Sequence, residues 1–384
     1  MRYFLTPHCS LKRLEVPSVY NVRSDELYEL DWPAFTFLQR CADEEGCSSE
    51  GRDREFLEYT LKEGILTDRR VRAKRSSTEK SPEPSLRYLE LQITMRCNLS
   101  CRHCYIGPPE DVELSLEKIK CVLAEFEKMQ GLRLLITGGE PLLHRRFPEI
   151  NELLPRYAFR KILFSNGVLL TEDIVSSLHV DEIQVSIDGL EKGHEALRGK
   201  GTFKRAMNAI ETARGAGFDV SVSTMVHSQN LDEFEGMEKQ LRGMGIKDWT
   251  VDVPCVDGNL RNNPLFHLEP EAAGRRLRHG FGEGLHRGAE GFACGLHLAS
   301  VLADGKVAKC AFYRSSPVGA VDEGLEVCWS RIAPVRLDEL ECDCAVRETC
   351  RGGCRYRAGL LGNPLGRDTY RCYAYGQEPG DQSA

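Results

Sequence analysis

Residues 87–258 alternate short apolar runs with amphipathic segments, and this alternation predicts the fold. The six apolar runs are predicted strands: Leu89–Thr94, Arg133–Thr137, Lys161–Ser165, Glu182–Ile187, Asp219–Val226 and Asp248–Pro254. Two amphipathic segments carry apolar residues at helical spacing: Leu116, Ile119, Leu123, Phe126 and Met129, then Phe203, Met207, Ile210 and Ala213. Repeated strand–helix units predict an α/β fold, with a parallel sheet and helices outside. Ligands of such sheets bind at the carboxyl ends of the strands.

Residues 1–71 predict a small α+β domain of a different kind. Its predicted strands and helices are Val19–Val22, Leu27–Leu30, Trp32–Cys41 and Arg54–Glu63. Asp31 is placed to cap the first helix, and Gly64 to end the second. Residues 72–86 are polar with two prolines, which indicates a linker to the alternating region.

Composition narrows the class of protein. The chain has 384 residues, enough for two or three domains, and 41% of them are apolar. It has no apolar run of eighteen residues and no secretion signal, so we expect a cytoplasmic protein without a membrane span. A net charge of −7 argues against nucleic acid as a partner. Sixteen cysteines in a reducing compartment indicate metal binding rather than disulfides.

Three of these cysteines lie directly after the first strand of the alternating region. Cys97, Cys101 and Cys104 are separated by three and then two residues. Three thiolates around one point can ligate three irons of a cubane cluster, which leaves the fourth iron open for chemistry. The alternative is a zinc knuckle with His103 as the fourth ligand, although structural zinc sites usually bring paired CxxC units.

This cysteine loop resembles that of the radical S-adenosylmethionine (SAM) superfamily. The resemblance implies a partial (β/α)6 barrel over residues 87–258 and catalytic Cys97, Cys101 and Cys104. In that family the open iron chelates SAM, and an electron from the cluster releases a 5′-deoxyadenosyl radical. The cofactor carries this chemistry, and the protein positions and shields it.

Further residues resemble the SAM contacts of that superfamily. The glycines of Gly138-Gly139-Glu140 permit close backbone approach, and the glutamate can accept a hydrogen bond from an ammonium group. By resemblance, this element binds the SAM amino group and Arg198 binds the carboxylate. The remaining expected SAM contacts are Asn166 and Ser186 along the ribose and His103 beside the adenine. The alternative for Arg198 is a solvated helix charge.

The C-terminal cysteines resemble the SPASM domain, an extension that carries auxiliary iron–sulfur clusters in peptide-modifying radical SAM enzymes. We assign it residues 291–384, after a bridging region at 259–290. The resemblance implies a first auxiliary cluster on Cys294, Cys310 and Cys354. It implies a second on Cys342, Cys344, Cys350 and Cys372. Together with the cluster of the first cysteine loop, we expect three 4Fe–4S clusters.

Two departures from the SPASM pattern matter. Cys342 and Cys344 are one residue apart where the family has two, which puts ligation of the second cluster in doubt. The first cluster lacks the usual upstream fourth cysteine. An open iron is the preferred interpretation, and it favours a thioether product because such an iron could bind a substrate thiolate. Closure by Cys255 or Cys328 is the alternative, Cys255 being the better placed of the two.

Residues 1–71 resemble the winged-helix-like peptide-recognition (PqqD-like) domain of peptide maturases, including its "EGIL" segment at Glu63–Leu66. Such a domain binds a leader peptide as an added strand; the alternative is a structural cap. The resemblances together imply a maturase of a ribosomally made precursor peptide, supplied by a flavodoxin- or ferredoxin-type electron donor. The rivals are a radical SAM enzyme acting on a small cofactor precursor or another protein, and a noncatalytic iron–sulfur or zinc regulator.

Overall fold

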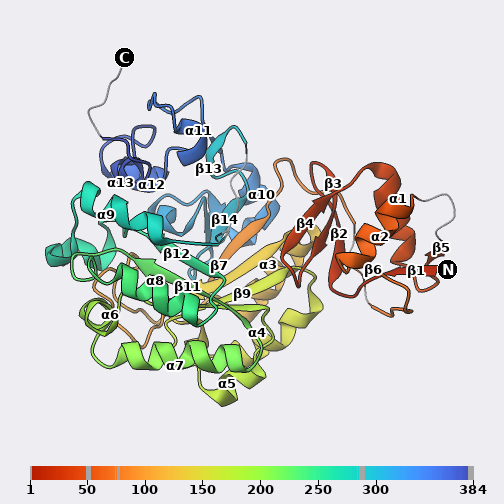
Figure 1. Cartoon of the computed structure of the whole chain (residues 1–384), viewed down its shortest axis with the longest axis horizontal. Helices are drawn as coiled ribbons and strands as arrows, with labels where there is room; N and C mark the ends of the chain where they lie inside the picture. Colours follow the sequence, from red (N-terminus) through yellow and green to blue (C-terminus); the bar gives the residue numbers. More distant parts are fainter. Residues whose placement is uncertain are drawn as a thin grey trace.

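Figure 1 shows a computed structural model of the chain, with a small N-terminal module beside a central sheet that the C-terminal region extends. The structure describes residues 2–48, 53–73, 75, 78–282, 284 and 290–378. Among these residues, every helix is too short or too polar to cross a lipid bilayer.

The N-terminal module holds two three-stranded sheets and two helices. Its strands are β1 (Arg2–Leu5), β2 (Cys9–Arg13), β3 (Pro17–Asn21), β4 (Glu26–Glu29), β5 (Cys47–Ser48) and β6 (Leu66–Thr67), and its helices are α1 (Trp32–Cys41) and α2 (Arg54–Lys62). The predicted helices and the β3–β4 hairpin are present; the pattern did not reveal β1, β2, β5 and β6. Asp31 caps α1 by accepting a hydrogen bond from the Ala34 amide at 2.7 Å.

The linker lies along one edge of the module rather than free in solvent. Lys80 forms a bridge with Arg13 of β2, and the Ser81 amide donates to the Arg13 carbonyl at 2.9 Å. In the sheet β2-β3-β4 this contact covers the outer edge of β2, which leaves β4 as the other edge strand. Edge strands expose unpaired backbone groups that can pair with another chain.

All six strands of the alternating region are present and parallel. They are β7 (Tyr88–Thr94), β8 (Arg133–Gly138), β9 (Arg160–Ser165), β10 (Glu182–Ser186), β11 (Asp219–Met225) and β12 (Asp248–Asp252). The helices between them are α3 (Leu116–Lys128), α4 (Phe147–Leu153), α5 (Glu172–Ser177), α6 (Glu191–Arg198), α7 (Thr202–Gly215) and α8 (Phe234–Gly243). Apolar side chains such as Leu134, Leu163 and Val222 are fully buried in the core between sheet and helices. That burial stabilises the layered arrangement.

The C-terminal region shares the main sheet, which the sequence did not indicate. Strand β14 (Leu298–Val301) pairs in parallel with β7, and β15 (Lys306–Ala308) and β16 (Gly319–Ala320) extend the sheet antiparallel. The sheet therefore has nine strands, in the order β12-β11-β10-β9-β8-β7-β14-β15-β16. Pairing with β14 satisfies the edge of β7 that a six-stranded sheet would expose.

The rest of the C-terminal half is short helices and one small ribbon. These elements are α9 (Pro270–Arg276), β13 (Phe292–Cys294), α10 (Leu325–Ser330), β17 (Val335–Arg336), α11 (Arg347–Cys350), α12 (Arg355–Leu360) and α13 (Thr369–Ala374). Helix α9, from the predicted bridging region, packs against α13. A Cβ at Gly274 would lie 2.4 Å from the Tyr370 carbonyl oxygen, so a glycine is needed for this close approach.

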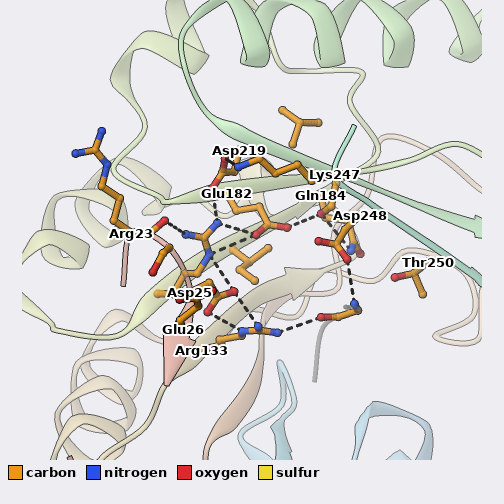
Figure 2. Close-up of a pocket in the computed structure, with 16 residues that line it drawn as sticks. Arg23, Asp25, Glu26, Arg133, Glu182, Gln184, Asp219, Lys247, Asp248 and Thr250 are labelled. Atoms are coloured by element: carbon orange, nitrogen blue, oxygen red, sulfur yellow. Dashed lines mark hydrogen bonds and ion pairs between the residues drawn. The ribbon is translucent and has the colours of Figure 1, made fainter. Parts of the chain in front are cut away.

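An ion-pair network joins the module to the amino ends of the barrel strands (Figure 2). Asp25, in the β3–β4 turn, adopts a left-handed conformation with φ of 64°. Its carboxylate lies 2.9 Å from Arg133 and 3.4 Å from Arg160, and it accepts a hydrogen bond from the Tyr20 hydroxyl. Arg160 also contacts Glu182 and Asp219, at 3.0 and 2.8 Å. Both arginines are buried, so the carboxylates neutralise charges that water does not reach.

Candidate active site

The three loop cysteines follow β7 at the carboxyl end of the sheet. Cys101 is buried, whereas Cys97 and Cys104 are partly exposed. The predicted bridging region holds this loop: the Asn259 amide donates to the Cys104 carbonyl, and the Asn259 side chain to the Cys101 carbonyl, both at 2.9 Å. Helix α6 contributes the Leu197 carbonyl, which accepts from the Arg102 amide at 3.0 Å. Segments far apart in the sequence therefore fix the loop.

The two glycines after β8 let that strand end pack on the start of the cysteine loop. Gly138 has a φ of 153°, and a Cβ there would lie 2.4 Å from the Thr94 carbonyl oxygen. A Cβ at Gly139 would lie 2.5 Å from the Arg96 carbonyl oxygen. The sequence predicted close approach to a ligand here; the structure adds that the glycines are required by backbone contact within the protein.

Glu140 lies behind the cavity wall, with no exposed surface. Its carboxylate accepts hydrogen bonds from the Ser165 hydroxyl at 3.1 Å and from the backbone amide of Asn166 at 2.9 Å. Burial raises the pKa of Glu140 to about 7, although these hydrogen bonds oppose the shift. Contact between Glu140 and a ligand ammonium group stays a prediction.

Asn166 and Ser186 line the cavity at the ends of β9 and β10. The side-chain amide of Asn166 donates to the Asn98 side-chain oxygen at 2.8 Å and lies 3.9 Å from the Cys97 sulfur. This contact ties the third strand end directly to the cysteine loop.

Arg198 is not a solvated helix charge. Its guanidinium donates to the Asp188 carboxylate and lies 4.0 Å from the Cys101 sulfur. Burial opposes ionisation of Asp188, but Arg198, His103, His194 and the Met225 amide together outweigh it and hold the pKa of that carboxyl below its usual range. The sequence gave no signal of this pairing, because Asp188 and Arg198 lie ten residues apart.

His103 points toward the same carboxylate. Its Nε2 lies 4.0 Å from Asp188 Oδ2, and its buried Nδ1 has no hydrogen-bond partner in the described part of the chain. Burial lowers the pKa of His103 to about 3, so the ring is neutral. An unpartnered buried nitrogen is costly unless a ligand satisfies it, and this feature favours a ligand in the adjoining cavity.

One cavity of about 520 Å³ connects these residues. Its wall includes most of the predicted loop and SAM contacts: Cys97, Cys101, His103, Cys104, Gly138, Gly139, Asn166, Ser186 and Arg198. Tyr105 and Phe312 line it as well, with ring centroids 4.9 Å apart, and no sequence signal marked them. Cys255 also lines this cavity, together with Ala311 and Phe312, so the cavity extends toward the C-terminal cysteines.

The first C-terminal cysteine group contains a fourth member. Cys294, Cys310 and Cys354 lie within electrostatic range of one another. Cys255, directly after β12, is hydrogen-bonded to Cys354. Cys328 is buried elsewhere, with its thiol 3.3 Å from the Ala320 carbonyl. Cys255 therefore lies with this group and Cys328 does not, and both an open iron and closure by Cys255 stay predictions.

The second C-terminal group also comes together. Cys350 interacts electrostatically with Cys342 and Cys344, and Cys372 with Cys344 and Cys350. The Cys350 sulfur accepts from the Gly352 amide at 3.3 Å. The short Cys342–Cys344 spacing thus does not separate these two residues from the group.

The loop cysteines form a donor set for a metal group. In the described ranges, no three Cys, His, Asp or Glu side chains converge as ligands of a single metal ion. Three thiols beside a partly apolar cavity fit a cubane cluster that is ligated at three of its irons.

Comparison with known proteins places the site in a family. Residues 91–241 match the model of the radical SAM superfamily. The mycofactocin maturase MftC of Mycolicibacterium smegmatis is 33% identical over 154 residues, 38% of this chain and 39% of that relative. MftC of Mycobacterium tuberculosis is 28% identical over 339 residues, 76% of this chain and 84% of the relative.

A solved structure resembles the whole chain. Streptococcus suis SuiB bound to its precursor peptide SuiA is similar with a TM-score of 0.64 and 13% identity, over 96% of this chain and 98% of that one. At this identity the likeness concerns the fold. Residues 91–241 form a radical SAM domain. The superfamily implies SAM and a 4Fe–4S cluster as cofactors.

Proposed function

We propose that the chain modifies a ribosomally made precursor peptide through radical SAM chemistry. The observation that carries this proposal is the single cavity whose wall includes the three loop cysteines and Cys255 of the first C-terminal group. Two comparisons support the peptide substrate: relatives are named maturases, and SuiB has been solved with a precursor peptide.

The loop residues fit the family's cofactors. Cys97, Cys101 and Cys104 would hold the cluster, and the neighbouring cavity of about 520 Å³ is large enough for a nucleoside-sized ligand. Burial raises the pKa of Cys101 to about 11, so cluster loading at neutral pH must release its proton. When bound, the cluster and SAM supply a 5′-deoxyadenosyl radical that removes a hydrogen atom from the substrate.

The chain's own residues would bind and orient the cofactor and would shield the reaction from water. The paired Arg198 and Asp188 present a fixed charge beside Cys101, and the free His103 nitrogen offers a hydrogen-bonding position. Gly138 and Gly139 hold the loop, and Asn166 and Ser186 line the route along it. Tyr105 and Phe312 cover the side toward the C-terminal cysteines and would exclude water from a reactive intermediate.

We infer two auxiliary clusters in the C-terminal region, three clusters in all. Cys294, Cys310 and Cys354 would hold the first together with Cys255; Cys342, Cys344, Cys350 and Cys372 would hold the second. A fully ligated first cluster would accept or relay an electron rather than bind a substrate thiolate. The argument for a thioether product then loses its basis, and the bond formed is left open in the proposal.

The N-terminal module would bind the leader of the precursor as an added strand. Support comes from β4, the edge of its sheet that the linker does not cover. Backbone pairing at a sheet edge supplies affinity, and side-chain pockets supply specificity. A flavodoxin- or ferredoxin-type protein would supply the electrons.

The test is anaerobic reconstitution of the chain, followed by incubation with SAM, dithionite and precursor peptides encoded beside its gene. The proposal expects 5′-deoxyadenosine together with a change in the mass of one peptide. Formation of 5′-deoxyadenosine with a small-molecule substrate, and with no peptide change, would contradict it.

A further inference from the structure

A second large cavity lies between the N-terminal module and the amino ends of the barrel strands, away from the cysteines. We call this space, of about 990 Å³, the interdomain cleft. Residues 7–10 and Arg23 line it from the module, Arg75 from the linker, and Arg156 and Lys161 from the barrel. It is thus formed only when module and barrel are docked together.

The interdomain cleft is cationic, although the chain is acidic overall. Its arginines and lysines are Arg23, Arg75, Arg156, Arg160, Lys161 and Lys247. Its acidic residues are Glu127, Asp181 and Asp219. Six cations against three anions oppose the sign of the chain's net charge of −7. The excess is therefore a local feature that would attract anionic groups.

Ion pairs within the cleft neutralise only part of this positive charge. Asp219 contacts both Arg160 and Lys247, at 2.8 and 3.1 Å, and Asp181 lies 3.5 Å from Lys161. These contacts account for Arg160, Lys161 and Lys247.

The remaining cations are free for a ligand. Arg23 and Arg156 are exposed and make no ion pair with any described residue. Arg75 donates to the carbonyls of Leu5, Thr6 and Cys9, but its buried Nε has no partner within the described ranges. Three arginines from module, linker and barrel thus offer donors to the same space.

The interdomain cleft is connected to the cavity of the loop cysteines through shared lining residues of a third cavity. It shares Arg23, Arg160, Asp219 and Lys247 with the smaller cavity of about 300 Å³ shown in Figure 2. That cavity in turn shares Gln184 and Thr250 with the cavity of the loop cysteines. Glu26, the first residue of the edge strand β4, lines the smaller cavity as well. A chain paired with β4 therefore starts beside the cleft.

We propose that the interdomain cleft binds an acidic segment of the precursor peptide. Aspartate or glutamate side chains would pair with Arg23 and Arg156, which are too exposed to contribute much to folding but can select a partner by charge. The inference rests on the proposed function, because it takes the peptide as the partner. Nucleic acid is the other polyanion, and the oligothymidylate probe of the test below distinguishes it from an acidic peptide.

The experiment measures binding of fluorescent twelve-residue peptides to the reconstituted chain by anisotropy. The probes are alternating Glu-Ala, Gln-Ala and Lys-Ala peptides and a twelve-nucleotide oligothymidylate. The Glu-Ala peptide should bind best, and less tightly as salt increases. The double variant R23E/R156E should weaken it by about tenfold, a change of roughly 1.4 kcal/mol. The matched control R40E/K239E reverses two exposed cations outside the cleft and should bind as the wild type does.

Equal binding of the Glu-Ala peptide to R23E/R156E and wild type would overturn the proposal. So would equal binding of the Gln-Ala peptide, or tighter binding of the oligothymidylate. Peptide-free formation of 5′-deoxyadenosine should be unchanged in R23E/R156E, which would show that the variant is folded and loaded. A wild-type chain that binds the probe but forms no 5′-deoxyadenosine would instead defeat the proposed function.

Discussion

The two ends of the parallel sheet treat buried charge in different ways. At the amino ends, Asp25, Glu182 and Asp219 neutralise Arg133 and Arg160 in a joint between module and barrel. At the carboxyl ends, Glu140 is held by neutral donors, and its pKa rises to about 7. The carboxyl end also holds the buried pair Asp188–Arg198, but there the pair lies beside Cys101 and Arg198 lines the cavity of the loop cysteines. Perturbed groups beside the loop cysteines therefore mark the carboxyl end as the candidate site of chemistry.

The largest effect is expected from a substitution at the carboxyl ends of the strands. G138A adds a Cβ at a φ of 153°, 2.4 Å from the Thr94 carbonyl oxygen, so the loop that carries Glu140 must move. A displacement of about 1 Å can lower a rate about a hundredfold, and we expect at least that loss in 5′-deoxyadenosine formation.

The control for G138A is G215A in α7, where a Cβ meets nothing within 4 Å and the backbone is helical. It should keep the wild-type rate and fold at least as stably, since alanine favours helix more than glycine. A G138A enzyme that cleaves SAM at the wild-type rate would show that the packing of this loop does not position the site.

At the amino ends of the strands, we expect a substitution to lower the free energy of unfolding. Arg160 is 4% exposed and contacts Asp25, Glu182 and Asp219. R160A leaves these carboxylates without their shared cation, which costs about 3 kcal/mol or more for a buried pair. Urea unfolding should show this loss. R54A, which removes an exposed pair with Glu58, should leave the free energy of unfolding nearly unchanged. Similar losses in the two variants would argue against a buried joint.

A smaller, pH-dependent effect is expected where the linker meets the module. Glu15 accepts from the Ser85 amide at 2.6 Å and pairs with Arg87 at 2.8 Å. Burial opposes ionisation, but these donors lower the pKa of Glu15 from 4.5 to about 2. Its contribution to stability is therefore complete above pH 4.5 and is lost as the pH falls toward 2.

The E15Q variant tests this dependence by urea unfolding at several pH values. Because Glu15 is partly exposed, we expect a loss of only about 1 kcal/mol at pH 7, shrinking as the pH falls below 4.5. E211Q, at an exposed position in α7 away from the first turn of the helix, should match the wild type throughout. A loss in E15Q that is the same at pH 3 and pH 7 would mean that the carboxylate charge is not responsible.

Local patterns predicted much of this molecule, and long-range contacts account for what they missed. Period and capping located α1 and all six barrel strands, because each signal lies within a few residues. The pairing of β14 with β7 could not be read, since Leu298–Val301 is short and its partner lies two hundred residues away. The Asp188–Arg198 pair was missed because its spacing gives no helical or strand signal, whereas Cys255 was named as an alternative cluster ligand and only its contact with Cys354 required the structure. The glycines after β8 were recognised, but their contact with Thr94 and Arg96 required the structure.

The central claim is that the loop after β7, and not the C-terminal cysteine groups, carries the radical chemistry. The most direct test compares 5′-deoxyadenosine formation by two triple alanine variants after anaerobic reconstitution. We predict none above background from C97A/C101A/C104A, because only this loop lies beside Gly138, Asn166 and Arg198. We predict continued SAM cleavage without peptide from C294A/C310A/C354A. Reductive cleavage of SAM by the first variant would contradict the account.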